Sequence, residues 1–299
     1  MSVFDRLAIA SLPLIPRPIM RRLASRYIAG ERLEDALAKL AELRDEGFGG
    51  IVDLLGEDVL EEPQARAVLA SYLAIGRAVH ERSLDAYVSV KPTHLGLRIS
   101  TQLAEELYAE LATELRELGL FLRVEMEDHT TTDDTLAVFA RLRADFDNVG
   151  IVLQSRLKRT LADVRALPRA RVNVRMVKGI YLEPAEIAHT EPEPIRAAYL
   201  DAVRALWQRG DFVSLATHDD GLAERVFALA RELGKGVKDY ELAVLLGVRE
   251  PLRRAWRNAG HPVRVYVPFG PEWRPYSQRR LRKNPQIFRH VLRDTLGLG

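Results

Sequence analysis

The segment from Tyr266 to Pro285, YVPFGPEWRPYSQRRLRKNP, contains the residues best suited to chemistry. It starts at the end of a short apolar run, passes through a Gly-Pro turn and continues as a helical pattern. On that helix Tyr276 shares one surface with Arg279 and Arg280, because residues three and four positions apart are neighbours. Two adjacent guanidinium groups near phenol rings suit a small ligand with a carboxylate at one end and an apolar body at the other.

The composition excludes several classes of protein. The 299 residues suffice for one large barrel or two medium domains. The 44 basic and 42 acidic residues nearly cancel, which gives no support to nucleic-acid binding. There is no cysteine, so disulfides, thiol nucleophiles, cysteine metal sites and iron–sulfur clusters are excluded. A reducing cytoplasm is compatible with this composition.

No run reaches the apolar length needed to span a bilayer. The apolar stretch Leu7 to Pro16 lacks a preceding basic region, contains Pro13 and is followed by arginines. We therefore interpret it as an N-terminal packing segment and expect no secretory signal. The basic region from Arg17 to Arg26 leaves a peripheral membrane contact open, although a solvated helix face is the preferred interpretation.

Short β-branched or apolar runs alternate with helical patterns along the chain. The helical patterns include Glu62 to Arg82, Thr101 to Leu118 and Glu193 to Gln208. This alternation predicts a parallel sheet covered by helices. The predicted strands are Ile51 to Leu55, Tyr87 to Lys91, Leu122 to Met126, Val149 to Gln154, Val172 to Lys178, Phe212 to Thr217, a weak one near Lys238 to Val244, and Val263 to Val267.

Eight such units fit an α/β fold of the (β/α)8 TIM-barrel type. The competing fold is an open doubly wound sheet, which usually has a Gly-rich turn after its first strand when it binds a dinucleotide. Here Leu55-Gly56-Glu57-Asp58 follows that strand, with neither a GxGxxG nor a Walker pattern. We expect one barrel domain over residues 1–299, with residues 1–47 as an N-terminal helical extension.

Most of the predicted strands end in a polar or ionisable side chain, and barrel active sites lie at these carboxyl ends. Strand ends also pass into polar loops, which is the alternative explanation for any single residue. Arg175 is the most informative, since an arginine within a buried strand needs a partner. The strand-end residues are Lys91, Glu125, Gln154, Arg175, Lys178, Thr217, His218 and Tyr266.

The excess of cations over carboxylates in this set predicts an anionic ligand or cofactor. A metal site is a poor fit, because Glu125, Glu127 and their neighbours alternate between opposite faces of a strand. A hydrolase triad has little support, since no serine lies in a nucleophile-elbow pattern to pair with His218.

Several motifs in order along the chain resemble the bacterial proline dehydrogenases, which oxidise L-proline with FAD. The most specific motifs are VRMVKGIYLEP, from Val174 to Pro184, and the YSQRRL helix. DLLGE, YVSVK, MEDHT, IVLQS, ATHD and LLGVR also match. The resemblance covers nearly the whole chain. It implies a distorted barrel that holds FAD non-covalently at the strand ends, with the last helix across the barrel mouth.

The resemblance also implies roles for individual residues. Arg279 and Arg280 match the pair that binds the substrate carboxylate, supported by Lys91. Tyr181, Leu245, Tyr266 and Tyr276 match residues that enclose the substrate ring. Arg175 matches the arginine beside the flavin N5 edge, and Glu125 matches an acidic residue that orients one of the paired arginines. The matched flavin contacts are Met126, Gln154, Lys178, Gly179, Ile180, Thr217 and His218.

The chain departs from the family pattern at a few positions, with Glu125 in place of aspartate and Lys283 in place of glutamate. These departures leave three hypotheses open. The first is FAD-dependent oxidation of L-proline to Δ1-pyrroline-5-carboxylate. The second is oxidation of another cyclic amino acid, such as a hydroxyproline or modified proline, and the third is a ligand-binding paralogue without turnover.

The resemblance further implies a cytoplasmic protein that passes electrons to a membrane quinone, with loose attachment to the inner membrane face. The sequence has no NAD fingerprint. Oxidation of the product would therefore need a separate pyrroline-5-carboxylate dehydrogenase.

Overall fold

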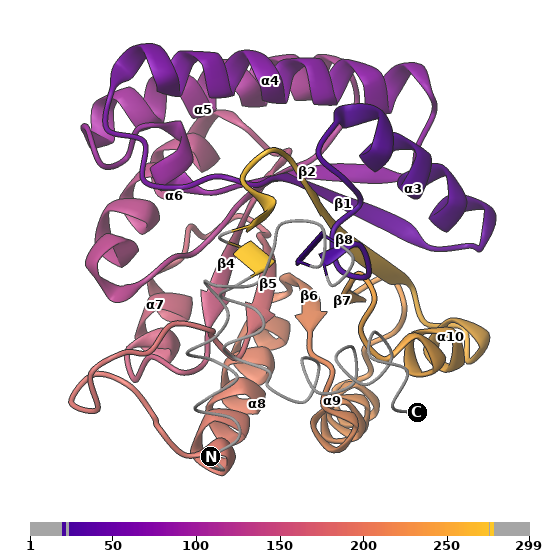
Figure 1. The fold of residues 1–299 in the computed structure, drawn as a ribbon. Helices are drawn as coiled ribbons and strands as arrows, with labels where there is room; N and C mark the ends of the chain where they lie inside the picture. The colour runs from indigo at the N-terminus through magenta and orange to yellow at the C-terminus, as the bar shows by residue number, and fades with distance from the viewer. Residues whose placement is uncertain (1–19, 22–23, 275, 278–299) are drawn as a thin grey trace, which may run out of the picture.

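The computed structural model describes residues 20–21, 24–274 and 276–277, which are coloured in Figure 1. Within this range, eight parallel strands close into a barrel in chain order, and β8 pairs with β1. The predicted fold class is therefore confirmed. The strands are β1 (Gly49–Leu54), β2 (Ala86–Val90), β3 (Leu122–Val124), β4 (Val149–Gln154), β5 (Asn173–Val177), β6 (Phe212–Ala216), β7 (Tyr240–Leu245) and β8 (Val263–Phe269).

The helices surround the barrel, as Figure 1 shows. α3 precedes the first strand and packs against β1 and β8. The N-terminal extension expected before it lies mostly outside the described residues. The helices are α3 (Leu33–Asp45), α4 (Glu62–Glu81), α5 (Thr101–Glu117), α6 (Thr132–Asp145), α7 (Thr160–Ala166), α8 (Pro192–Arg209), α9 (Asp220–Glu232) and α10 (Glu250–Asn258), with 3-10 turns η2 (Pro92–Leu95) and η3 (His129–Thr131).

Each helix covers the barrel with one apolar face. On α4, the buried residues Leu69, Tyr72 and Val79 recur at helical spacing, while charged residues face solvent. Burying a side chain of this size contributes about 1.5–3 kcal/mol. The Tyr72 hydroxyl also donates to the carbonyl oxygen of Leu54 at 3.2 Å, which fixes α4 to the end of β1.

The barrel interior has an apolar centre. Ile51, Tyr87 and Ala243 are buried there, because alternate residues of each strand point inward. A charged layer lies near the amino ends of the strands, where Arg264 donates to Glu241 at 2.8 Å and Arg123 donates to the Asn173 side chain at 2.6 Å. A second charged layer lies at the carboxyl ends.

The predicted strands are confirmed within a few residues at their ends. β3 is the exception of interest, because it ends at Val124 and not at Met126. The Glu125 amide still donates to the Val90 carbonyl at 2.9 Å, but the carboxyl groups of Glu125 and Glu127 then bind other strands and loops. After Val124, the contacts of the Glu125 and Glu127 carboxyl groups take the place of backbone pairing between β3 and its neighbouring strands.

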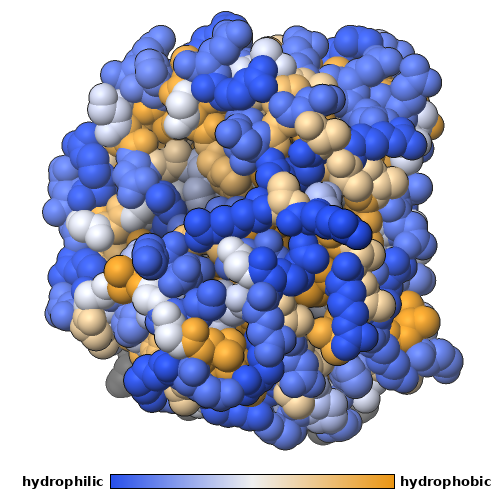
Figure 2. Space-filling model, turned by 180° about the vertical axis from the view of Figure 1, so that it is seen from behind, coloured by the Kyte–Doolittle hydropathy of each residue, from blue (hydrophilic) through white to orange (hydrophobic). Residues whose placement is uncertain are grey.

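One face of the described part of the molecule is largely hydrophilic. Figure 2 shows polar side chains over most of one face, with apolar residues in small separate groups. No helix in the described ranges is both long and apolar enough to cross a membrane.

Candidate active site

Glu125, directly after β3, and Arg175, in the middle of β5, form a buried ion pair. Their side chains are 11% and 5% exposed. Ser89 at the end of β2 donates its hydroxyl to Glu125 Oε1, and the Tyr266 hydroxyl of β8 lies 3.3 Å from the same oxygen. The Arg175 guanidinium lies 5.3 Å from the centre of the Tyr266 ring. Four strands thus meet through one carboxylate.

This arrangement keeps both partners charged. Burial disfavours the Glu125 carboxylate, but the charge and hydrogen bond of Arg175, the Ser89 hydroxyl and the charge of Lys91 together outweigh burial, so the pKa of Glu125 is lowered. Burial likewise opposes the charge on Arg175, but Glu125 together with Tyr87 and Tyr266 outweighs burial, so the pKa of the arginine is raised. The expectation that Arg175 needs a buried partner is confirmed, and the partner is Glu125.

Lys91 lies in the same layer, directly after β2. Its ammonium group donates to Glu57 at 2.8 Å, and the Lys91 side chain is 13% exposed. Burial lowers the pKa of Lys91, while Asp53 and Glu57 raise it more, so the net pKa is raised and the group stays protonated. Lys91 therefore supplies a permanent positive charge close to the Glu125–Arg175 pair.

Asp53 completes this layer from β1. Its side chain is buried, and burial raises its pKa from 3.8 to about 7, with Lys91 opposing the rise and Glu125 adding to it. No role is predicted for Asp53 from the sequence. The available signal was a single carboxylate inside an otherwise apolar strand, the same signal that identified Arg175.

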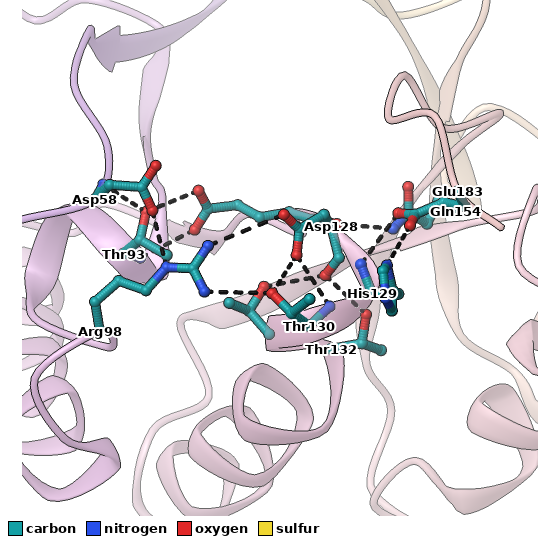
Figure 3. Close-up of polar contacts among 11 residues, drawn as sticks. Asp58, Thr93, Arg98, Asp128, His129, Thr130, Thr132, Gln154 and Glu183 are labelled. Carbon is teal, nitrogen blue, oxygen red and sulfur yellow. Dashed lines mark hydrogen bonds and ion pairs between the residues drawn. The ribbon is translucent and has the colours of Figure 1, made fainter.

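A hydrogen-bonded network joins the loops around the barrel mouth (Figure 3). Glu127 accepts from both the backbone amide and the hydroxyl of Thr93, at 2.9 and 2.8 Å. Arg98 donates to Asp58 at 2.8 Å and to the Thr130 hydroxyl at 3.3 Å. The network connects the loops after β1, β2 and β3, which surround Lys91 and Glu125.

The same network reaches the loop after β5, which contains several predicted ligand contacts. The His129 amide donates to the Glu183 carboxylate at 3.0 Å, and the His129 ring bonds to its other oxygen. The Glu183 side chain is buried. We infer that it fixes the segment from Lys178 to Leu182 against the loop after β3.

Apart from Met126, which follows β3, the predicted cofactor residues lie at the ends of β4, β5 and β6. Lys178 and Arg196 both donate to Asp219 at 2.8 Å. Burial opposes ionisation of Asp219, yet these bonds outweigh it, and the pKa of the carboxyl is lowered. Asp219 also caps α9 by accepting from the Leu222 amide at 3.1 Å.

Gly179 lies directly beside Gln154. A methyl group added at Gly179 would lie 2.9 Å from Gln154 Oε1, and the backbone has φ +96°, which favours glycine. The Gln154 amide donates to the Glu127 carbonyl at 2.8 Å, which orients its side chain. The Gln154 and Arg156 side chains therefore fill the space beside Gly179, and this packing together with the positive φ accounts for the glycine.

The remaining predicted residues are positioned as follows. The Leu245 amide donates to His218 Nε2 at 2.9 Å, so this ring nitrogen is an acceptor engaged with the backbone. Met126 packs in the main apolar core, and Thr217 is buried. Ile180 is 64% exposed, whereas Tyr181 and Tyr276 are partly buried. The structure brings these residues to one end of the barrel, but their contacts with a ligand stay predictions.

The predicted carboxylate-binding pair, Arg279 and Arg280, lies outside the described residues, as does Lys283. Their assignment stays a prediction from the sequence.

The residues present fit a flavin at this end of the barrel. Nη1 of Arg175 is buried and has no hydrogen-bond partner in the described part of the chain. It is therefore a charged donor available to an acceptor atom. The Gln154 amide and the Lys178 ammonium lie at the ends of the neighbouring strands β4 and β5 and are further polar groups suited to a large polar cofactor.

Comparisons with known proteins agree with this geometry. A family model described as proline dehydrogenase matches residues 36–290. The proline dehydrogenase of Deinococcus radiodurans is 33% identical over 290 residues, covering 94% of this chain and 93% of the relative. Proline dehydrogenase 1 of Bacillus subtilis strain 168 is 28% identical over 273 residues, covering 91% and 90%.

A solved structure supports the fold. Proline utilization A (PutA) from Bdellovibrio bacteriovorus, inactivated by N-propargylglycine, aligns with a TM-score of 0.82 at 23% identity. The alignment covers 87% of this chain and 32% of that one, so the chain spans about a third of the PutA length.

The family model extends over most of the chain, and a 33% identical relative is matched along nearly its whole length. The resemblance found in the motifs is therefore confirmed. The chain belongs to the proline dehydrogenase family of oxidoreductases.

Proposed function

We propose that this protein oxidises L-proline to Δ1-pyrroline-5-carboxylate with FAD as its cofactor. The observation that carries the proposal is the buried Glu125–Arg175 pair at the barrel mouth, with one arginine N–H free of partners among the described residues. Membership of the proline dehydrogenase family supports the substrate. FAD, when bound, would supply the electron-accepting ring that takes a hydride from the substrate carbon next to nitrogen.

Arg175 would place a permanent positive charge beside the cofactor. A fixed charge of this kind favours reduction, because the flavin ring becomes more negative when it accepts electrons. Glu125 holds the guanidinium in place, assisted by the Ser89 hydroxyl. Gly179, Gln154 and Lys178 would contact the cofactor from β4 and β5, and Met126, Ile180, Thr217 and His218 are further proposed contacts.

The substrate carboxylate would bind to cations. We assign Arg279 and Arg280 to direct bidentate binding and Lys91 to the charge behind them. Lys91 is suited to this role because its ion pair with Glu57 fixes its position. Tyr181, Leu245, Tyr266 and Tyr276 would enclose the apolar ring and exclude water, which aligns the reacting carbon.

Electrons must then leave the reduced cofactor. We propose a membrane quinone as acceptor, reached by peripheral contact of a cytoplasmic protein with the inner membrane face. A separate pyrroline-5-carboxylate dehydrogenase would oxidise the product. These proposals rest on the sequence resemblance. They predict that a short-chain quinone reoxidises the reduced protein faster than NAD does.

Steady-state assays with an artificial dye acceptor test the proposed function. Protein saturated with FAD should reduce the dye with L-proline and show little activity with D-proline. A hydroxyproline or modified proline that outperforms L-proline would indicate the second hypothesis. Thermal stabilisation by L-proline without any dye reduction would indicate a non-catalytic paralogue, and protein that binds no FAD would refute the proposal.

A further inference from the structure

The loop between β5 and α8, residues 178–191, is longer than the other described connections from a strand to the next α-helix. The next longest of these connections, after β2, spans residues 91–100. The loop begins with the predicted ligand contacts from Lys178 to Tyr181. A long loop that carries ligand contacts needs fixed points, because a flexible segment loses conformational entropy when it becomes ordered.

Backbone hydrogen bonds fix this loop to the loop after β4 at two places. Near its start, the Arg156 amide donates to the Lys178 carbonyl at 3.0 Å. Toward its end, the Lys158 amide donates to the Ile187 carbonyl at 2.9 Å. The segment between these two fixed points, residues 179–184, therefore needs its own attachment to the barrel mouth.

This segment has one buried side chain next to exposed ones. Ile180 and Leu182 are 64% and 93% exposed, whereas the Glu183 side chain is 1% exposed. A buried carboxylate is unfavourable unless it is hydrogen-bonded. Glu183 accepts from the backbone amide of His129 at 3.0 Å through one oxygen, and its other oxygen lies 2.5 Å from Nδ1 of the His129 ring (Figure 3).

His129 belongs to a part of the mouth that is held from several sides. The carboxylate of the preceding residue, Asp128, accepts from the Thr130 amide at 2.9 Å and so caps the short helix η3. Arg98, from the loop after β2, donates to the Thr130 hydroxyl at 3.3 Å. His129 is therefore a suitable fixed point for the carboxylate of Glu183.

The position of the segment matters for both ligands of the proposed reaction. Ile180 is a proposed contact of FAD, and Tyr181 is a proposed contact of the substrate ring. Glu183 lies only two residues beyond Tyr181, so a shift of its carboxylate would also move that ring. A misplacement of about 1 Å in an active site can slow a reaction by about 10²-fold.

We propose that Glu183 and His129 form a hydrogen-bonded latch, which holds residues 179–184 where they retain FAD and place Tyr181 against the substrate. Both are positioning residues, because they act through Ile180 and Tyr181. They lie in the motifs VRMVKGIYLEP and MEDHT, in which no role is predicted for either of them. The inference rests on the proposed function and adds to it the attachment of the loop after β5.

The rate at which the loaded protein releases FAD after dilution, followed by flavin fluorescence, tests the latch. Glu183→Ala removes both bonds and should speed release by about 10- to 100-fold, the factor expected for hydrogen bonds of a charged group. His129→Ala keeps the backbone amide and should speed release less, by about 3- to 10-fold. The double variant should release FAD no faster than Glu183→Ala, because the ring has then already lost its partner.

Two further variants separate the latch from general damage to the loop. Lys158→Met removes an ammonium group that donates to the Ala185 carbonyl at 2.8 Å, and it should change FAD release by less than about twofold. Glu183→Gln offers one oxygen to the His129 amide and one N–H to the ring, so it should restore most of the FAD retention. Release from Lys158→Met as fast as from Glu183→Ala, or no recovery in Glu183→Gln, would overturn the latch.

Limited proteolysis of the cofactor-free protein gives a measurement that does not depend on FAD. Chymotrypsin cleaves after tyrosine and leucine, and Tyr181 and Leu182 lie in the latched segment. Cleavage there should be about tenfold faster in Glu183→Ala than in wild type, because a loosened segment enters a protease active site more readily. Lys158→Met should be cleaved there at the wild-type rate within about twofold.

The two measurements separate the latch from the function on which it rests. Equal cleavage or equal FAD release in wild type and Glu183→Ala would overturn the latch even if L-proline reduces the flavin. Wild-type protein that binds no FAD would instead refute the proposed function, and the cleavage rates would still decide on the latch. If Glu183→Ala does not fold, His129→Ala decides, and unchanged FAD release in that variant overturns the latch.

Discussion

Removing the charge of Glu125 should destabilise the barrel strongly, because it leaves the guanidinium of Arg175 buried without its partner. Both side chains are nearly inaccessible, at 11% and 5% exposure. Breaking a buried pair from one side typically costs about 3–5 kcal/mol. For Glu125→Gln we expect the lower end of this range, because Asp53 loses the repulsion of Glu125 and ionises more readily beside the arginine.

The free energy of unfolding of the reverse variant, Arg175→Met, should depend on pH. In Arg175→Met, Glu125 loses the charge that lowers its pKa, so burial raises that pKa and the group takes up a proton in mildly acidic solution. The cost of Arg175→Met should therefore be larger at pH 8 than at pH 5. The double variant Glu125→Gln/Arg175→Met should lose less unfolding free energy than the two single variants lose in sum, with a coupling energy of up to about 3 kcal/mol.

Urea unfolding of the cofactor-free protein, followed by circular dichroism at pH 8, measures these costs. The exposed pair Arg204–Glu232, with side chains 41% and 57% exposed, provides the matched control. Glu232→Gln should cost no more than about 1 kcal/mol. A Glu125→Gln variant that is no less stable than Glu232→Gln would show that the buried pair does not organise the barrel mouth.

Three further predictions concern the pH response, the cofactor and the substrate. Because the pKa of Asp53 rises from 3.8 to about 7 on folding, the folded state binds more protons between these values, and stability falls as pH rises through this window. Asp53→Asn should abolish that loss, which amounts to about 4 kcal/mol at most, and unchanged pH dependence of urea unfolding would count against the buried position of Asp53. Gly179→Ala should lower the FAD content of the purified protein, because its φ of +96° and its contact with Gln154 oppose a side chain; full FAD occupancy would contradict the close approach. Arg279→Met should raise the KM for L-proline by more than tenfold and leave FAD content unchanged, whereas Arg282→Met on the same segment serves as the charge-matched control; equal effects of the two would remove the carboxylate assignment.

The sequence predicted the barrel well, because each strand has a local signal. A short β-branched run such as Val149 to Gln154 is recognisable without its neighbours, and the alternation with helices then determines the sheet type. The polar residues at strand ends, Lys91 and Arg175 among them, also follow from local pattern, since the barrel brings the carboxyl ends together.

The partners of these residues could not be predicted, because they depend on contacts across the barrel. Arg175 on β5 binds Glu125 after β3, and Glu125 also contacts Tyr266 on β8. No pattern in the sequence indicates which side chains of non-neighbouring strands contact each other inside the barrel. For the same reason the sequence did not distinguish the charged layer around Arg123, near the amino ends of the strands, from the charged layer around Glu125 and Arg175.

The proposed function requires that L-proline reduces a flavin bound at this barrel mouth. Anaerobic titration of the FAD-loaded protein with L-proline, followed by visible absorbance, measures this directly. We predict that the flavin band bleaches as L-proline is added, and that an equivalent amount of Δ1-pyrroline-5-carboxylate forms. A band that stays unchanged at saturating L-proline, in protein that dithionite reduces normally, would contradict the account.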